Sequence, residues 1–167
     1  VLHRACAPGQ PCLMLDVLLK EIMKTIKWPL DPVWEFNQTK NFDIFLDAIL
    51  VLTELEVKCY LEIEDKSIQF SEKFEVKEES NLSQGQFKPI GNYYKLSKEF
   101  ILELKEQTKD IGIINHFIVY NEEILLDACD VPFDPFQVSR VVTDLHLKRM
   151  SKLLNIEPKL VTDVYGN

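Results

Sequence analysis

Residues 115–135 read NHFIVYNEEILLDACDVPFDP, and this stretch decides the fold. Two short apolar runs, 117–120 and 124–126, flank the turn-forming segment Asn-Glu-Glu at 121–123. Neither run alternates polar with apolar residues, so both faces of each strand have to be covered. The stretch therefore predicts a hairpin in the centre of a sheet, with helices or further strands packed over it.

Apolar residues recur at helical spacing in four further stretches. The first runs from Met14 to Lys27, and the Trp28-Pro29 pair ends it because the residue before a proline avoids the helical region. Asn41, Ser97 and Thr143 are candidate N-caps of the other three. We therefore expect about four helices.

A second region has the alternation of a strand with one solvated face. Apolar and polar residues alternate from Val57 to Ile63, and the alternation resumes from Ile68 to Val76. This pattern predicts a second hairpin. The sequence as a whole thus predicts a single α+β domain with about four helices around a mainly antiparallel sheet built from two hairpins. Residues 1–13 contain no acid, unlike the rest, so we expect an extension there and the domain at 14–167, with Met14 as the natural start.

Charge and composition limit the partners. The 167-residue chain has a formal net charge of −8, whereas nucleic acid or an anionic membrane calls for a basic surface. No apolar stretch approaches the roughly 20 residues of a membrane span, and the N-terminus lacks the apolar core of a signal peptide. We therefore expect a cytoplasmic protein with a basic protein partner, and neither nucleic acid nor a membrane. Phosphate-binding glycine loops are absent, and no cofactor is expected.

The sharpest local feature is a run of acids without neutralising cations. Between Lys109 and Arg140 there is no lysine or arginine. The six acids of this interval are Asp110, Glu122, Glu123, Asp127, Asp130 and Asp134. Three interpretations remain open. The aspartates cap turns or pair with the basic final helix, or the acids form a patch for a basic partner, or two of them serve catalysis as metal ligands or as an acid and a base.

Evidence for a catalytic site is weak at the level of sequence. Metal-assisted hydrolysis would require His116 to converge with Asp127, Asp130 and Asp134 across the hairpin, which their spacing alone does not specify. Cys129 has no base near it in the sequence. No catalytic residue and no metal ligand is therefore predicted, and His116 is expected to be structural rather than a general base.

The four cysteines do not form a zinc-binding pattern. Cys59 and Cys129 fall in apolar strand patterns and are expected to pack in the core as small hydrophobic residues. Cys6 and Cys12 could close a loop through a disulfide, but no cysteine or histidine pair has zinc-ligand spacing.

A small, acidic α+β domain with a dense acid cluster and no catalytic signature resembles the immunity proteins of bacterial toxin systems, including contact-dependent inhibition. The resemblance covers the chain from about Met14 and implies a cytoplasmic inhibitor that blocks a basic toxin domain. Our leading hypothesis is a binding protein whose contact residues are the five acids of the hairpin region. They are Glu122, Glu123, Asp127, Asp130 and Asp134. The alternatives are a carboxylate- and metal-dependent hydrolase, and a structural subunit or homodimer that uses a sheet edge.

Overall fold

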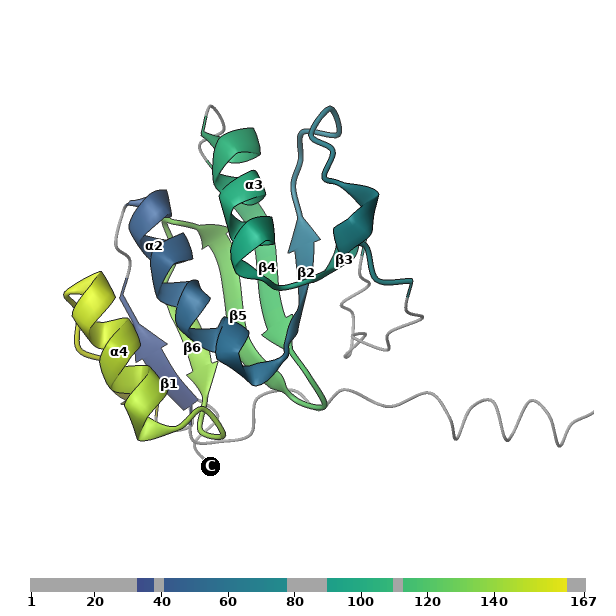
Figure 1. Ribbon diagram of the computed structural model, residues 1–167. Helices are drawn as coiled ribbons and strands as arrows, with labels where there is room; N and C mark the ends of the chain where they lie inside the picture. Colours follow the sequence, from purple (N-terminus) through teal and green to yellow (C-terminus); the bar gives the residue numbers. More distant parts are fainter. Residues whose placement is uncertain (1–32, 38–40, 78–89, 110–112, 162–167) are drawn as a thin grey trace, which may run out of the picture.

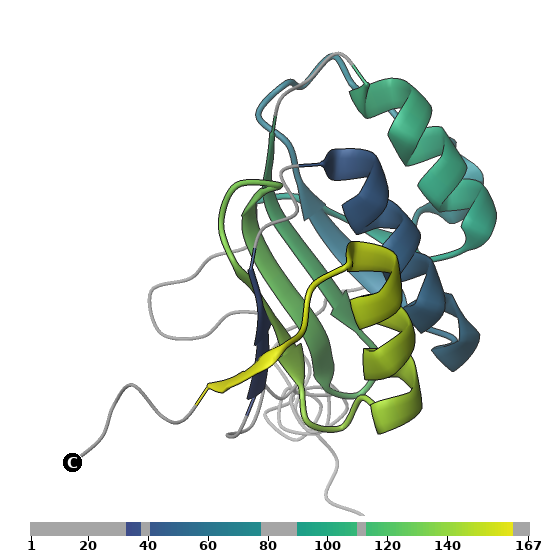
Figure 2. The same cartoon turned by 90° about the vertical axis from the view of Figure 1, so that its left-hand side faces the viewer.

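The computed structural model describes residues 33–37, 41–77, 90–109 and 113–161. These residues form one seven-stranded antiparallel sheet with α-helices on one of its faces (Figures 1 and 2), which confirms the α+β class. The strand order is β3-β2-β4-β5-β6-β1-β7. The strands are β1 (Val33–Phe36), β2 (Lys58–Glu62), β3 (Asn92–Lys95), β4 (Ile114–Tyr120), β5 (Ile124–Val131), β6 (Phe136–Ser139) and β7 (Lys159–Val161).

The predicted central hairpin is confirmed as β4 and β5, which occupy the middle of the sheet. Both faces of β4 are buried, as its uninterrupted apolar run requires. Phe117 and Val119 belong to the main core under the helices. Ile118 and Tyr120 belong to a second cluster on the opposite face, with Tyr60, Ile124 and the partly buried Tyr93. The hairpin is therefore the element that both cores share.

Three α-helices and two 3-10 helices lie within the described residues. They are α2 (Phe42–Ile49), η1 (Leu50–Leu55), η2 (Glu72–Phe74), α3 (Lys98–Thr108) and α4 (Asp144–Leu154). Two predicted N-caps are confirmed by side-chain hydrogen bonds. Asn41 accepts from the backbone N–H of Ile44, and Ser97 accepts from that of Phe100, each at 3.1 Å. Thr143 is the N-cap residue of α4 but makes no such bond.

A β-bulge in the central hairpin determines which side chains share a face. Tyr120 pairs with Ile124, but the next pair is Val119 with Leu126, so Leu125 is the extra residue. Both Leu125 and Leu126 consequently pack in the core under the helices. From there on, every β5 side chain is shifted by one position relative to a regular hairpin.

The prediction of a second hairpin is wrong. β2 pairs instead with β3 and β4, and only Glu75 of the segment after it makes an isolated bridge, to Tyr94. Phe70 and Phe74 meet the ring of Phe100 at centroid distances of 5.4 and 5.5 Å. The apolar residues of this segment therefore pack over the end of the core from irregular and 3-10 structure. Their side chains leave water without the segment forming a strand.

Other features of the sequence lie outside the described part or were not anticipated. The expected helix at 14–27 and the expected extension at 1–13 fall among residues that are not described. Strands β6, β1 and β7 on one side of the central hairpin, and β3 at the opposite edge, were not predicted. None of the helices in the described ranges has the length and apolarity needed to cross a bilayer.

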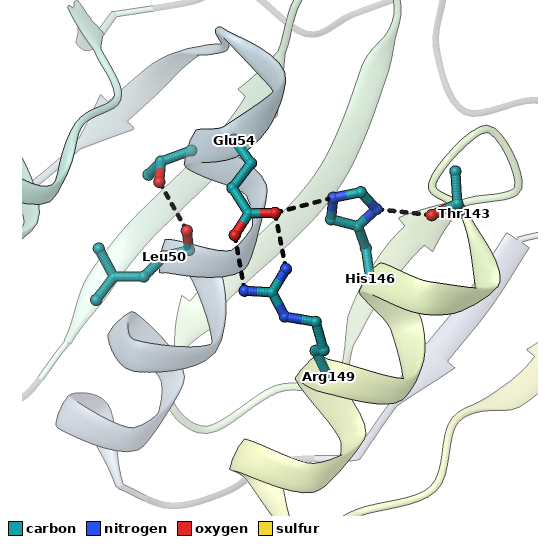
Figure 3. Close-up of polar contacts among 6 residues, drawn as sticks. Leu50, Glu54, Thr143, His146 and Arg149 are labelled. Carbon is teal, nitrogen blue, oxygen red and sulfur yellow. Dashed lines mark hydrogen bonds and ion pairs between the residues drawn. The ribbon is translucent and has the colours of Figure 1, made fainter.

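Helix α4 is joined to η1 by an ion pair on the helical face of the molecule (Figure 3). Arg149 donates two hydrogen bonds of 2.7 Å to the two carboxylate oxygens of Glu54. His146 lies 3.6 Å from the same carboxylate, and its other ring nitrogen is 2.7 Å from the hydroxyl of Thr143. The bonds from Arg149 hold the pKa of Glu54 below its usual range. Arg149 therefore pairs with Glu54 and not with an acid of the central hairpin.

Candidate functional site

The five acids of the leading hypothesis do not form one cluster. Glu122 and Glu123 lie in the turn before β5, whereas Asp130 and Asp134 lie at its far end. Seven residue steps along β5 separate Glu123 from Asp130, which corresponds to about 23 Å at 3.3 Å per residue. Asp127 lies between them on the strand, on the sheet face that turns away from the helices. The acids were thus predicted on the correct hairpin, but the structure shows that they lie toward its two ends.

The turn after β5 combines the two distal acids with an exposed aromatic ring. The backbone N–H groups of Phe133 and Asp134 both donate to the carbonyl of Asp130, at 2.7 and 3.3 Å. These bonds close the turn, while Val131 and Pro132 are buried beneath it. Phe133 is 48% exposed, and both aspartates beside it are exposed. A closed turn therefore presents one exposed phenyl ring and two exposed carboxylates.

His116 lies on the face of the hairpin that turns away from the helices, and it contacts both neighbouring strands. It pairs across the sheet with Cys129 of β5 and with Glu62 of β2. Its Nε2 lies 2.7 Å from Oδ1 of Asp127, which precedes Cys129 by two residues on the same face. The ring of Tyr60 meets the imidazole edge to face at 5.8 Å. The imidazole of His116 is consequently nearly buried, with 11% of its side chain exposed.

The position of Cys129 corrects a prediction. Cys59 is fully buried in the main core, as expected, but Cys129 is exposed and does not pack in the core. The bulge at Leu125 explains the difference, because it places Ala128 under the helices and turns Cys129 to the opposite face. Cys129 thus joins His116 and Asp127.

The neighbours of His116 favour its protonated form. Burial alone lowers the pKa of an imidazole, but the contacts with Asp127 and Cys129 outweigh burial here and raise the pKa of His116 to about 10. Asp127 is therefore paired with His116, in place of the final-helix cations that one interpretation of the sequence assigned to it.

The relative positions of the three side chains restrict the chemistry. A nucleophilic relay through histidine requires the carboxylate on one ring nitrogen and the nucleophile on the other, hence on opposite sides of the ring. Here the sulfur of Cys129, a carboxylate oxygen of Asp127 and a ring nitrogen of His116 all lie within 4.8 Å of one another. The thiol and the carboxylate are thus on the same side of the imidazole. Such an arrangement fits three groups that converge on one point better than it fits a relay.

Comparison with known proteins gives no further indication of function. No protein-family model, curated protein or solved structure matches this chain.

Sequence reasoning missed two features of these sites. Cys129 is separated from Asp127 by one residue, a spacing that puts two strand side chains on one face, but its pairing with His116 depends on the bulge. Phe133 stands between Pro132 and Pro135 in a segment with turn chemistry, which favours an exposed position. The pairing of Cys129 with His116 could be found only from the register of the hairpin, whereas the exposure of Phe133 could have been predicted from the sequence.

Proposed function

We propose that this chain is a cytoplasmic binding protein that neutralises a basic protein partner, in the manner of the immunity proteins that it resembles. The observation that carries the proposal is the closed turn at the end of β5, on which Phe133, Asp130 and Asp134 are all exposed. Buried aromatic anchors surrounded by a polar rim supply most of the binding energy in protein interfaces. The carboxylates select a basic partner, and the ring provides the apolar contact.

The acids at the other end of the hairpin extend the same surface. A standard interface buries about 800 Å² on each partner, which corresponds to a patch roughly 30 Å across. The span from Glu123 to Asp130, about 23 Å, falls within that width. A partner of ordinary size can therefore contact Glu122 and Glu123 as well as the distal turn. The chain's net charge of −8 speeds the encounter with a cationic protein through long-range attraction.

The test begins with capture of the partner from the native host, followed by identification and by measurement of its association and dissociation rates. Reversing the charge of both turn acids, as Asp130→Lys with Asp134→Lys, should slow association by about tenfold or more at low salt. Added salt should slow association of the unaltered chain and shrink this difference. The matched control is Glu72→Lys with Glu106→Lys, which changes the net charge equally at exposed positions in η2 and α3, away from the hairpin.

A third variant separates the anchor from the charges. Phe133→Ala should leave association nearly unchanged and speed dissociation, with a loss of affinity of about thirtyfold for an anchor that contributes 2 kcal/mol. A captured partner that is not basic, or association rates that do not differ between the turn variant and its control, would contradict the proposal.

A further inference from the structure

We infer that His116, Asp127 and Cys129 form a binding site for a zinc-type metal ion on the sheet face opposite the helices. The site adjoins the turn that carries the proposed partner surface, since Cys129 directly precedes Asp130, but it does not depend on that proposal. It rests on three donor groups from two adjacent strands. Cys129 and His116 are direct cross-strand partners, and Asp127 lies one side-chain position along the same face.

The donor set selects the class of ion. A thiolate, an imidazole and a carboxylate together match zinc, which accepts sulfur, nitrogen and oxygen ligands. Calcium and magnesium prefer oxygen ligands alone, so a cysteine and a histidine disfavour them. Three protein ligands leave one tetrahedral position for water or another molecule, as in catalytic zinc sites. Cys129 is exposed, which gives an ion and that fourth ligand a route from solvent.

The distances require only small movements. Bonds of about 2.0–2.3 Å to a tetrahedral zinc ion place its ligand atoms roughly 3.4–3.6 Å apart. The nitrogen and oxygen of the His116–Asp127 pair are 2.7 Å apart and would open to admit an ion. All three donor atoms already lie within 4.8 Å of one another, so the sulfur has to approach by about 1 Å at most. An exposed cysteine can make this movement by rotation of its side chain.

Neighbouring residues support the orientation of the histidine. The ring of Tyr60 packs against the imidazole, and the Tyr60 hydroxyl donates a 3.0 Å hydrogen bond to Glu62. Glu62 is itself the cross-strand partner of His116 on β2. Such surrounding contacts hold a ligating histidine in place and tune its affinity for the metal.

The experiment measures cobalt and zinc binding to the full chain. His3, Cys6 and Cys12 could bind metal independently, so the parent protein carries Cys6→Ser and Cys12→Ser. Equilibrium dialysis of this metal-free parent with Co²⁺ should give one ion per chain. Its spectrum should show a sulfur-to-cobalt charge-transfer band, which reports a thiolate ligand. Zn²⁺ should displace the cobalt and abolish the band.

Variants then assign the ligands. Cys129→Ser should abolish the band and weaken cobalt binding by about 100-fold or more, since a lost ligand costs at least as much as the 10–100-fold cost of a lost outer partner. Asp127→Asn and His116→Gln should also weaken binding. Asp43→Asn removes an exposed acid on α2, outside both proposed sites, and is the matched control, with unchanged affinity expected.

Cys129→Ser is the decisive variant because its side chain is exposed and its loss leaves the core intact. An unfolding midpoint equal to that of the parent confirms that this variant is folded. Three results would overturn the inference. They are the absence of stoichiometric cobalt binding to the parent, a band that persists in Cys129→Ser, and an equal loss of affinity in Asp43→Asn and Asp127→Asn.

Discussion

The hydroxyl of Tyr60 links the second core to the loop that leads into β3, and its removal should cost measurable stability. The backbone N–H groups of Ile90 and Gly91 donate to it at 3.0 and 2.9 Å, and it donates to Glu62 at 3.0 Å. Tyr60→Phe keeps the buried ring and removes all three hydrogen bonds. Each contributes about 1 kcal/mol in net terms, so the free energy of unfolding should fall by about 3 kcal/mol.

Urea denaturation followed by far-ultraviolet circular dichroism measures this change. With a slope of about 1–3 kcal/mol per M, the midpoint should fall by about 1 M or more while the slope stays constant. Tyr93→Phe is the control, because Tyr93 packs on the Tyr60 ring at 5.3 Å but is only partly buried, and its loss should stay within about 0.5 kcal/mol.

Hydrogen exchange provides a second, local measurement. The amides of Ile90 and Gly91 should exchange faster in Tyr60→Phe, because both lose their acceptor. Equal midpoints for the two tyrosine variants, together with unchanged exchange at these amides, would refute the assignment of this hydroxyl as a structural contact.

Two further predictions follow from burial and charge. Under native conditions a thiol reagent should modify Cys129 and spare Cys59, because burial raises the pKa of the Cys59 thiol and blocks access to it. Peptide mapping by mass spectrometry measures the labelling of each cysteine. Equal labelling of the two would contradict this prediction. In metal-free protein the contacts of His116 with Asp127 and Cys129 outweigh its burial and raise its folded-state pKa from 6.5 to about 10. The stabilising contribution of these contacts is complete below about pH 6.5 and is lost as the pH rises through about 10. Denaturation across that range should show a decline in stability that Asp127→Asn reduces, whereas identical profiles would exclude the pair as its cause.

The central hairpin was predictable because its signal is local. Its two apolar runs lie on either side of a three-residue turn, and burial on both faces follows directly from their composition. The N-caps Asn41 and Ser97 were equally readable, since a capping side chain bonds to an amide three residues away. Features that depend on neighbours in the sequence were therefore recovered.

The outer strands of the sheet and the irregular segment after β2 were not recovered, because contacts with residues distant in the sequence decide them. Strand β1 pairs with β6 and β7, which lie 100 residues or more away, and its four residues carry no alternation long enough to indicate a strand. Phe70 and Phe74 do alternate in the manner of a strand, but packing against Phe100 satisfies them without one. Tertiary contacts decided these segments, and the local pattern could not.

The candidate sites divide in the same way. The acids were located on the hairpin from charge alone, but their separation along β5 follows from strand length, which the boundaries of the apolar runs left undefined. The convergence of His116, Asp127 and Cys129 needed the register, and the turn sequence by itself would have placed Ala128 opposite His116.

The extra residue at Leu125 makes chain length a determinant of surface chemistry. If the hairpin were one residue shorter at that point, every following side chain of β5 would turn to the opposite face. The polar side chains of Asp127 and Cys129 would then face the helices instead of His116. A relative that keeps His116, Asp127 and Cys129 but lacks the extra residue would therefore have the same three residue types without bringing them together. Aligning such sequences requires the spacing from Tyr120 to Asp127 to be preserved along with the residues themselves.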